Sequence, residues 1–129
     1  MGLGAALLIL LYPLAKRFLA IPQTILGLAF SFGIPIAFAS QDNLSLITWV
    51  IFLANFLWVV AYDTVYGMID AADDEKLDIG NSARYFGRRK EKWIFLLGLA
   101  HLFIYFFVGL SLNLDLSFLF FLSLCFVIV

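Results

Sequence analysis

The sequence predicts an all-α fold, an integral membrane helical bundle with about five hydrophobic segments. Hydrophobic residues make up 64% of the chain and charged residues 13%, whereas soluble domains average about 45 to 50% and about 25%. The apolar residues form long runs, and the charged residues gather between them. The net charge of −1 gives no indication of a nucleic-acid partner. The composition therefore favours a protein whose main partner is the lipid bilayer.

Five apolar segments follow one another along the chain: about 1–15, 22–40, 44–66, 93–112 and 116–129. A helix needs about 20 apolar residues to span the hydrocarbon core, and the three middle segments reach this length or nearly so. The two outer segments are shorter, and we expect both to be parts of spanning helices. We therefore expect one membrane domain over 1–129, taken from the middle of a longer protein.

The basic residues predict how the chain crosses the membrane. Lys16 and Arg17 follow the first segment, and the other six lie between the third and the fourth (Lys76, Arg84, Arg88, Arg89, Lys90 and Lys92). If the segments alternate, these two connections share one side of the bilayer, which the positive-inside rule makes cytoplasmic. We therefore expect a cytoplasmic Asp-rich and basic loop over about 67–92. The membrane would be the bacterial inner (plasma) membrane or, alternatively, the mitochondrial inner membrane.

A regular row of polar side chains lies where the third segment ends. Asp63, Tyr66, Asp70 and Asp74 are separated by 3, 4 and 4 residues, a spacing that stacks them along one helical face. Carboxylate oxygens suit Mg²⁺, which takes one or two protein carboxylates and completes its shell with water and phosphate oxygens. Because Lys and Arg side chains bind phosphate directly, this pattern predicts a Mg²⁺-dependent diphosphate site.

Simpler interpretations exist for several of these side chains. A solvated cluster of mutually paired charges is the favoured interpretation for the acids off that face (Asp73, Glu75, Asp78 and Glu91). Tyr12 and Lys16, taken alone, would be an interfacial tyrosine and a snorkelling lysine. His101 lies in an apolar helix without Cys or His companions, and we expect a hydrogen-bonded packing residue. Asp63 is different, because apolar residues flank it and its carboxylate needs a partner.

Three blocks of the chain resemble the UbiA family of membrane prenyltransferases, in particular its 4-hydroxybenzoate branch. They are LYPLAKR (11–17), IPQTILGLAFSFGIPIAFAS (21–40) and WVVAYDTVYGMIDAADDEK (58–76), in the order in which the family has them. The first block has the family's Tyr-x-x-x-Lys pattern at Tyr12 and Lys16. The third looks like the family's second Asp-rich motif. The resemblance covers nearly the whole chain but only the middle of a family member.

The resemblance implies a partial UbiA-type fold, an all-helical bundle with a cavity that faces the cytoplasm. In such enzymes two Asp-rich motifs bind the diphosphate of a polyprenyl donor through Mg²⁺, and the prenyl group passes to an aromatic acid, here 4-hydroxybenzoate in ubiquinone biosynthesis. The matching positions are Asp70 and Asp74 for the metal, Asp63 and Tyr66 as catalytic residues, and Tyr12, Lys16, Arg17 and Lys76 for the diphosphate.

The chain departs from the family pattern in two places. The first Asp-rich motif, Asn-Asp-x-x-Asp-x-x-x-Asp, is absent, so we expect the 129-residue chain to be inactive by itself. After Lys76 the family usually continues Ile-Gly-Ile-Lys-Ser, whereas this chain has LDIGNS over 77–82, which exchanges a cation for a glycine. Two other functions remain open: a membrane cation transporter with intramembrane acids, and a non-catalytic membrane assembly subunit.

Overall fold

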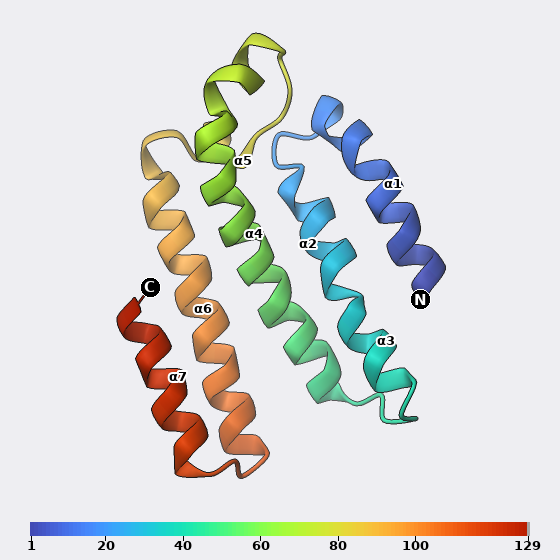
Figure 1. Ribbon diagram of the computed structural model, residues 1–129, viewed down its shortest axis with the longest axis vertical. Helices are drawn as coiled ribbons and strands as arrows, with labels where there is room; N and C mark the ends of the chain where they lie inside the picture. Colours follow the sequence, from blue (N-terminus) through green and yellow to red (C-terminus); the bar gives the residue numbers. More distant parts are fainter. Residues whose placement is uncertain (129) are drawn as a thin grey trace.

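The computed structural model describes residues 1–128, with the side chains of Leu119, Ser123 and 125–128 left aside, and within that range it is all helical (Figure 1). The elements are α1 (Gly2–Phe18), α2 (Gln23–Ser31), α3 (Gly33–Ala39), α4 (Leu46–Lys76), α5 (Ser82–Phe86), the 3-10 helix η1 (Gly87–Arg89), α6 (Lys90–Ser111) and α7 (Leu116–Ile128). No strand is present among these residues, which confirms the predicted all-α fold class.

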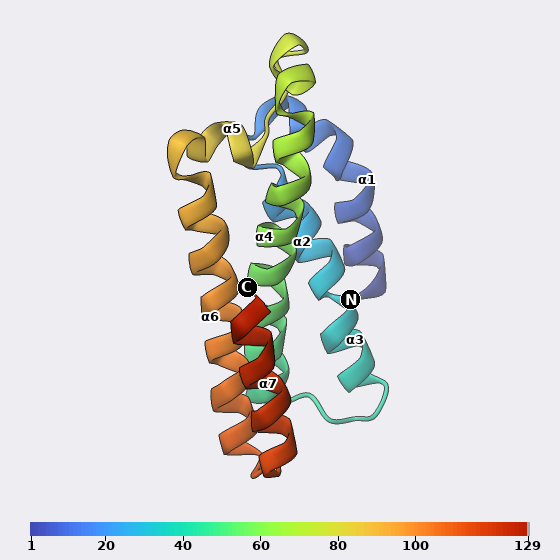
Figure 2. The ribbon, with the colours of Figure 1, turned by 60° about the vertical axis from the view of Figure 1, so that its left-hand side comes forward.

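The long helices lie roughly parallel, in the order α1, α2 with α3, α4, α6 and α7 (Figures 1 and 2). The connection between α1 and α2 and the connection between α4 and α6 lie at the same end of the bundle (Figure 1). The connections after α3 and α6 lie at the other end. The chain therefore alternates in direction as expected, and both Lys- and Arg-bearing connections share one end, which is called the charged end below.

Two helical segments are long and apolar enough to cross a membrane: Leu46–Lys76 and Ser82–Ser111. The first has 31 residues, about 46 Å at 1.5 Å per residue, which exceeds the roughly 30 Å of a hydrocarbon core. The polar end of α4 must therefore extend beyond the hydrocarbon. Within 67–92, where we expected a loop, α4 continues to Lys76 because Ala71, Ala72 and Glu75 favour helix, and α5 and η1 follow it.

A proline divides the second apolar segment into two helices. α2 ends at Ser31 and α3 begins at Gly33. Pro35 has no backbone N–H to donate to the carbonyl of Ser31, four residues earlier, and its ring would clash with that carbonyl. The hydroxyl of Ser31 accepts a hydrogen bond from the Asn55 amide of α4 (3.1 Å). The break between α2 and α3 is therefore hydrogen-bonded to the middle of α4.

Three helices end in the same way, with a non-glycine residue in the left-handed conformation. These residues are Asp42 after α3, Asp78 after α4 and Asn113 after α6, with φ of 50°, 49° and 50°. At the end of α4 the N–H of Ile79 reaches back to the carbonyl of Asp74 (3.1 Å), the bond that defines a Schellman motif. Asp and Asn are the side chains that tolerate this conformation best after glycine.

Small residues and one histidine bring α4 against its neighbours. A Cβ at Gly27 of α2 would lie 3.0 Å from the Phe56 and Val60 side chains of α4, so glycine permits this close approach. On the other side, Ala54 of α4 is fully buried, and its carbonyl lies 2.8 Å from Nδ1 of His101. His101 is thus a hydrogen-bonded packing residue, as expected.

Candidate active site

The predicted face of α4 lines a small cavity at the charged end of the bundle. Asp63, Tyr66, Asp70 and Asp74 all line it, together with Gly67 of the same helix, and Tyr12, Lys16, Gln23 and Asn81 complete the lining. The cavity has a volume of about 30 Å³, which is about the volume of one water molecule in the liquid. Its side chains would have to separate before a diphosphate could enter.

Asp63 has the partner that its apolar surroundings require. The Tyr12 hydroxyl of α1 donates to Oδ2 of Asp63 at 3.3 Å, and both side chains are half-buried. Lys16 lies one turn further along α1, with its Nζ 5.5 Å from the centre of the Tyr12 ring. The Tyr-x-x-x-Lys pattern of α1 therefore faces the carboxylates of α4, and the hydrogen bond between Tyr12 and Asp63 joins the two helices.

Asp74 and Asn81 form a buried pair that the sequence did not predict. The Asn81 side-chain amide donates to Oδ2 of Asp74 at 2.5 Å and to the carbonyl of Gly67 at 2.8 Å. Asn81 is 2% exposed and Asp74 is 8% exposed. Asn81 also caps α5, because its Oδ1 accepts from the N–H of Ala83 (2.8 Å). The Asn-Ser pair before ARYF is a helix-start signal, but nothing in it points to Asp74.

Three consecutive residues, Gly80, Asn81 and Ser82, hold the charged ends of α1, α2 and α4 together, and we name them the 80–82 clasp. The N–H of Gly80 donates to the carbonyl of Lys16 in α1 (2.6 Å). The N–H of Ser82 donates to Oε1 of Gln23 in α2 (3.0 Å), and the Ser82 hydroxyl lies 2.8 Å from that of Thr64 in α4. The clasp therefore positions α1 relative to the carboxylate face.

Gly80 explains why this loop lacks the cation that the family resemblance led us to expect. A Cβ at Gly80 would lie 1.8 Å from the backbone carbonyl oxygen of Leu19. No side chain fits there, and the backbone of the end of α1 occupies the space instead. The loop and the end of α1 are in direct backbone contact at Gly80.

Two predicted diphosphate-binding residues lie outside the carboxylate cavity. Arg17 lines a separate, more open pocket of about 570 Å³, on the other side of Lys16. Lys76 is exposed and forms an ion pair with Asp73 at 2.8 Å. This pair fits the solvated-cluster interpretation of Asp73.

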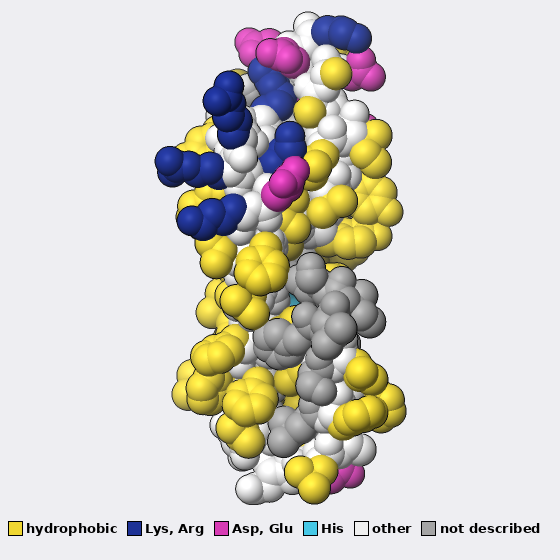
Figure 3. Space-filling view, turned by 90° about the vertical axis from the view of Figure 1, so that its left-hand side faces the viewer, with side chains coloured by type: hydrophobic (Ala, Val, Ile, Leu, Met, Phe, Trp, Pro, Cys, Tyr) yellow, Lys and Arg dark blue, Asp and Glu magenta, His cyan; other side chains and the backbone are white. Residues whose placement is uncertain are grey.

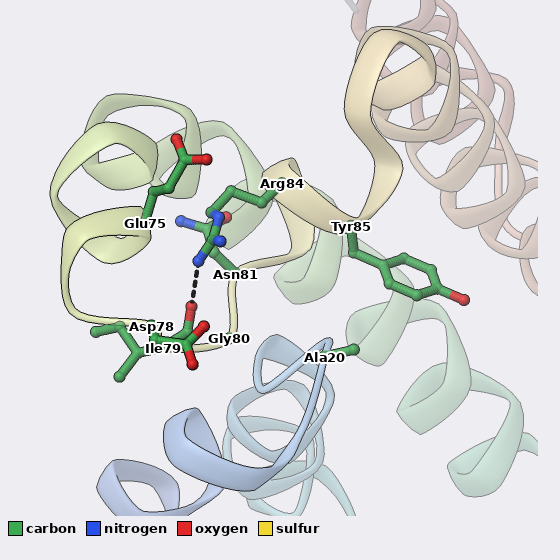
Figure 4. Close-up of a pocket in the computed structure, with 8 residues that line it drawn as sticks. All are labelled: Ala20, Glu75, Asp78, Ile79, Gly80, Asn81, Arg84 and Tyr85. Carbon is green, nitrogen blue, oxygen red and sulfur yellow. Dashed lines mark hydrogen bonds between the residues drawn. The ribbon is translucent and has the colours of Figure 1, made fainter.

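A third pocket, of about 530 Å³, opens on the outer side of the clasp (Figure 4). Its lining includes Glu75, Asp78 and Arg84. Nη1 of Arg84 donates to the carbonyl of Ile79 at 2.8 Å, the bond drawn in Figure 4, and to the carbonyl of Asp74 at 3.2 Å. Arg84 thus caps the end of α4, and its contact with two backbone carbonyls makes it a structural residue.

Comparison with known proteins shows the family to which the chain belongs. Residues 1–129 match the model of the UbiA prenyltransferase family over their whole length. The chain belongs to this family. The 4-hydroxybenzoate octaprenyltransferase of Aeromonas salmonicida is 49% identical over 110 residues, which are 84% of this chain and 38% of that protein. The enzyme of the same name from Burkholderia ambifaria is 48% identical over 108 residues, 83% of this chain and 37% of that protein. No solved structure matched.

The chain therefore spans a little over a third of the length of these UbiA relatives. Prenyltransferases of the UbiA family generally use a divalent metal, and the donors lining the cavity fit one. Carboxylate oxygens of Asp63, Asp70 and Asp74 line one wall of the cavity, although no three His, Cys, Asp or Glu side chains converge as a ready ligand set within the described part of the chain. One or two carboxylates suffice for Mg²⁺, since water and phosphate complete its shell.

Proposed function

We propose that this chain forms the second Asp-rich half of the active site of a Mg²⁺-dependent aromatic polyprenyltransferase. Such an enzyme transfers a polyprenyl group from polyprenyl diphosphate to an aromatic acid. The observation that carries this proposal is the meeting of Tyr12 and Lys16 with Asp63, Asp70 and Asp74 in one cavity. The relatives are named 4-hydroxybenzoate octaprenyltransferase, which supports 4-hydroxybenzoate as the acceptor and ubiquinone biosynthesis as the pathway.

The proposed roles follow from the position of each side chain. Asp70 is exposed at the rim of the cavity and Asp74 is buried below it, and these two would hold Mg²⁺, which neutralises charge on a leaving diphosphate. Lys16 would bind phosphate oxygens directly. Tyr12 would have to release Asp63 for a diphosphate to enter, because their hydrogen bond crosses the cavity. Arg17 and Lys76 would contribute charge from outside the cavity.

The reaction itself needs no covalent enzyme intermediate. The bond between the first prenyl carbon and the diphosphate oxygen breaks, and its electron pair leaves with the diphosphate. The electron-rich carbon ortho to the phenol attacks the allylic cation, and transfer of the ring proton to water or the released diphosphate restores aromaticity. Preorganised positive charge stabilises the departing diphosphate. We assign Asp63 and Tyr66, which lie deeper along α4 than Asp70, to the reacting end of the site.

We further propose that the charged end faces the cytoplasm from the bacterial inner membrane, with the mitochondrial inner membrane as the alternative. All eight basic residues lie in the two connections at this end or in the helix turns that adjoin them, and the positive-inside rule then gives the orientation. A transporter would combine intramembrane acids with an interrupted helix. Here the interruption at Ser31 bonds Asn55, two turns of α4 away from Asp63, so this observation does not favour a transporter.

A graft tests the proposed function. The 110 residues of the Aeromonas salmonicida enzyme that match this chain would be replaced by the residues of this chain, and membranes would be assayed for prenylated 4-hydroxybenzoate. We expect the graft to be active and the 129-residue chain alone to be inactive, since the chain lacks the first Asp-rich motif, and diphosphate departure needs preorganised charge on both sides of the site. An inactive graft that inserts at normal levels, or turnover by the purified chain alone, would contradict the proposal.

A further inference from the structure

Four exposed or half-exposed cations gather at the turn into α6. They are Arg88 and Arg89 of η1 and Lys90 and Lys92 of the first turn of α6, and we name them the basic corner. Glu91 is the only acidic residue within the corner. Figure 3 shows Lys and Arg side chains projecting at the charged end, directly beside a surface of hydrophobic side chains. The corner takes no part in the cavity described above.

The basic corner has no ion-pair partner within the described part of the chain. The ion pair found there joins Lys76 and Asp73 of α4. Cations in the first turn of a helix also lie next to the positive end of its dipole, where they are unfavourable. The acids of α4 do not compensate this charge, although they lie at the same end of the bundle. The corner therefore keeps an excess of positive charge, four cations against Glu91, that an external anion would stabilise.

The residues that follow the corner place it at the depth of lipid headgroups. Trp93 comes directly after Lys92, is 44% exposed, and stacks on Phe86 of α5 with ring centres 5.5 Å apart. Phe95 and Leu96 are exposed in the next turn. Trp favours the interface between water and hydrocarbon, so the four cations lie just outside the hydrocarbon. A soluble acidic protein would have to displace headgroups to reach them.

We propose that the basic corner binds the phosphate groups of anionic phospholipids in the leaflet at the charged end. Clusters of four or more Lys and Arg residues next to a spanning helix attract anionic headgroups, and the attraction is screened by salt. The Phe86–Trp93 stack links the end of α5 to the first turn of α6, the helix on which Lys90 and Lys92 lie. This binding is independent of catalysis and of the proposed function.

Tryptophan quenching by brominated lipids tests the proposal on the full 129-residue chain. The Trp49→Phe/Trp58→Phe variant keeps Trp93 as its single fluorophore and is reconstituted in phosphatidylcholine vesicles that contain either brominated phosphatidylglycerol or brominated phosphatidylcholine. We expect brominated phosphatidylglycerol to bind next to Trp93 at least about threefold more strongly at low salt, and the preference to disappear at high salt. Equal quenching by the two lipids at low salt would overturn the proposal.

Matched controls identify the source of the preference. A chain with Trp49 alone reports on the opposite end of α4, and we expect no lipid preference there. Replacing all four cations by Gln should remove the preference at Trp93, whereas Arg88→Lys/Arg89→Lys/Lys90→Arg/Lys92→Arg should retain it. Circular dichroism checks that the variants fold. A preference that survives the four Gln substitutions would refute a lipid site at the basic corner.

Discussion

At the scale of single residues, the backbone conformation at the end of α4 limits what the sequence can place there. Asp78 has φ of 49°, in the left-handed region where glycine carries no steric penalty. An aspartate in this conformation carries part of the steric cost. Asp42 after α3 and Asp78 after α4 both have this conformation. At these helix ends, a substitution by glycine can therefore increase the stability of the protein.

Asp78→Gly should raise the free energy of unfolding by about 0.5 to 1 kcal/mol, because the steric cost of the left-handed conformation exceeds the added entropy of the unfolded glycine. Unfolding in mixed micelles of SDS and a mild detergent, followed by circular dichroism, measures this change. Leu77→Gly is the matched control. Leu77 has φ of −92°, so glycine there should destabilise, and equal effects at 77 and 78 would contradict the argument.

Gly80→Ala should destabilise the protein by about 1 to 3 kcal/mol, the usual cost of forcing extra atoms into a packed site. The added methyl would meet the backbone carbonyl of Leu19 at 1.8 Å, and backbone cannot rotate away as a side chain can. Gly33→Ala is the control, because a Cβ there meets nothing within 4 Å. Thermal unfolding measures both variants. A lower melting temperature for Gly33→Ala than for Gly80→Ala would show that the clasp does not constrain position 80.

At the scale of elements, the interaction between α4 and the start of α5 depends on one buried amide. Asn81→Ala removes the donor to Asp74 and to the Gly67 carbonyl, and leaving buried groups unpaired costs about 1 to 3 kcal/mol. In a double-mutant cycle, Asn81→Ala and Asp74→Ala together should cost less than the sum of the single changes, because both remove the same contact. Strict additivity in the unfolding free energies would argue against the pair.

The elements also show why the sequence predicted only part of the fold. The five apolar segments correspond to α1, α2 with α3, α4, α6 and α7, because hydrophobic length is a strong signal in a membrane protein. The break at Pro35 was missed, since proline is tolerated in many spanning helices. The spacing of the acids predicts helix as far as Asp74, whereas the charge of 67–92 predicts a loop, and in the structure α4 extends to Lys76.

At the scale of the whole molecule, the two proposed metal ligands should respond differently to the same substitution in the grafted enzyme. Asp70→Asn should reduce kcat/KM more than about 100-fold, beyond the usual effect of an outer-shell partner, with unchanged stability because Asp70 is exposed. Asp74→Asn should lose activity and also stability, since its carboxylate bonds the buried Asn81. Assays at several Mg²⁺ concentrations, together with protein levels, measure both effects.

Three comparisons complete this test. Asp73→Asn should be milder, because Asp73 pairs with Lys76 away from the cavity. The Asp70→Asn/Asp74→Asn double variant should lose little more activity than the worse single variant, because the two residues act as a unit. Lys16→Met should raise the KM for polyprenyl diphosphate. Near-native activity of both single Asp variants would exclude these carboxylates as metal ligands.

The site as a whole was predictable where side chains carry its chemistry. The spacing of the four residues on α4 predicted their common face, and the family resemblance brought Tyr12 and Lys16 to it. The clasp was not predictable, because two of its bonds come from the backbone N–H groups of Gly80 and Ser82. Every residue except proline has a backbone N–H group, so the sequence does not indicate which of these groups form bonds. The Asn81–Asp74 contact depends on the fold of the loop between these two residues.

The clasp also fixes when the site can first exist during synthesis of the chain. Ser82 bonds a residue 59 positions earlier in the sequence, so α1, α2, α3 and α4 must all leave the ribosome before this bond can form. Until then the carboxylate face of α4 has no link through the clasp to α1. The emergence of three residues, Gly80 to Ser82, then joins three helices almost at once. The last part of the site to be translated is thus the part that assembles it.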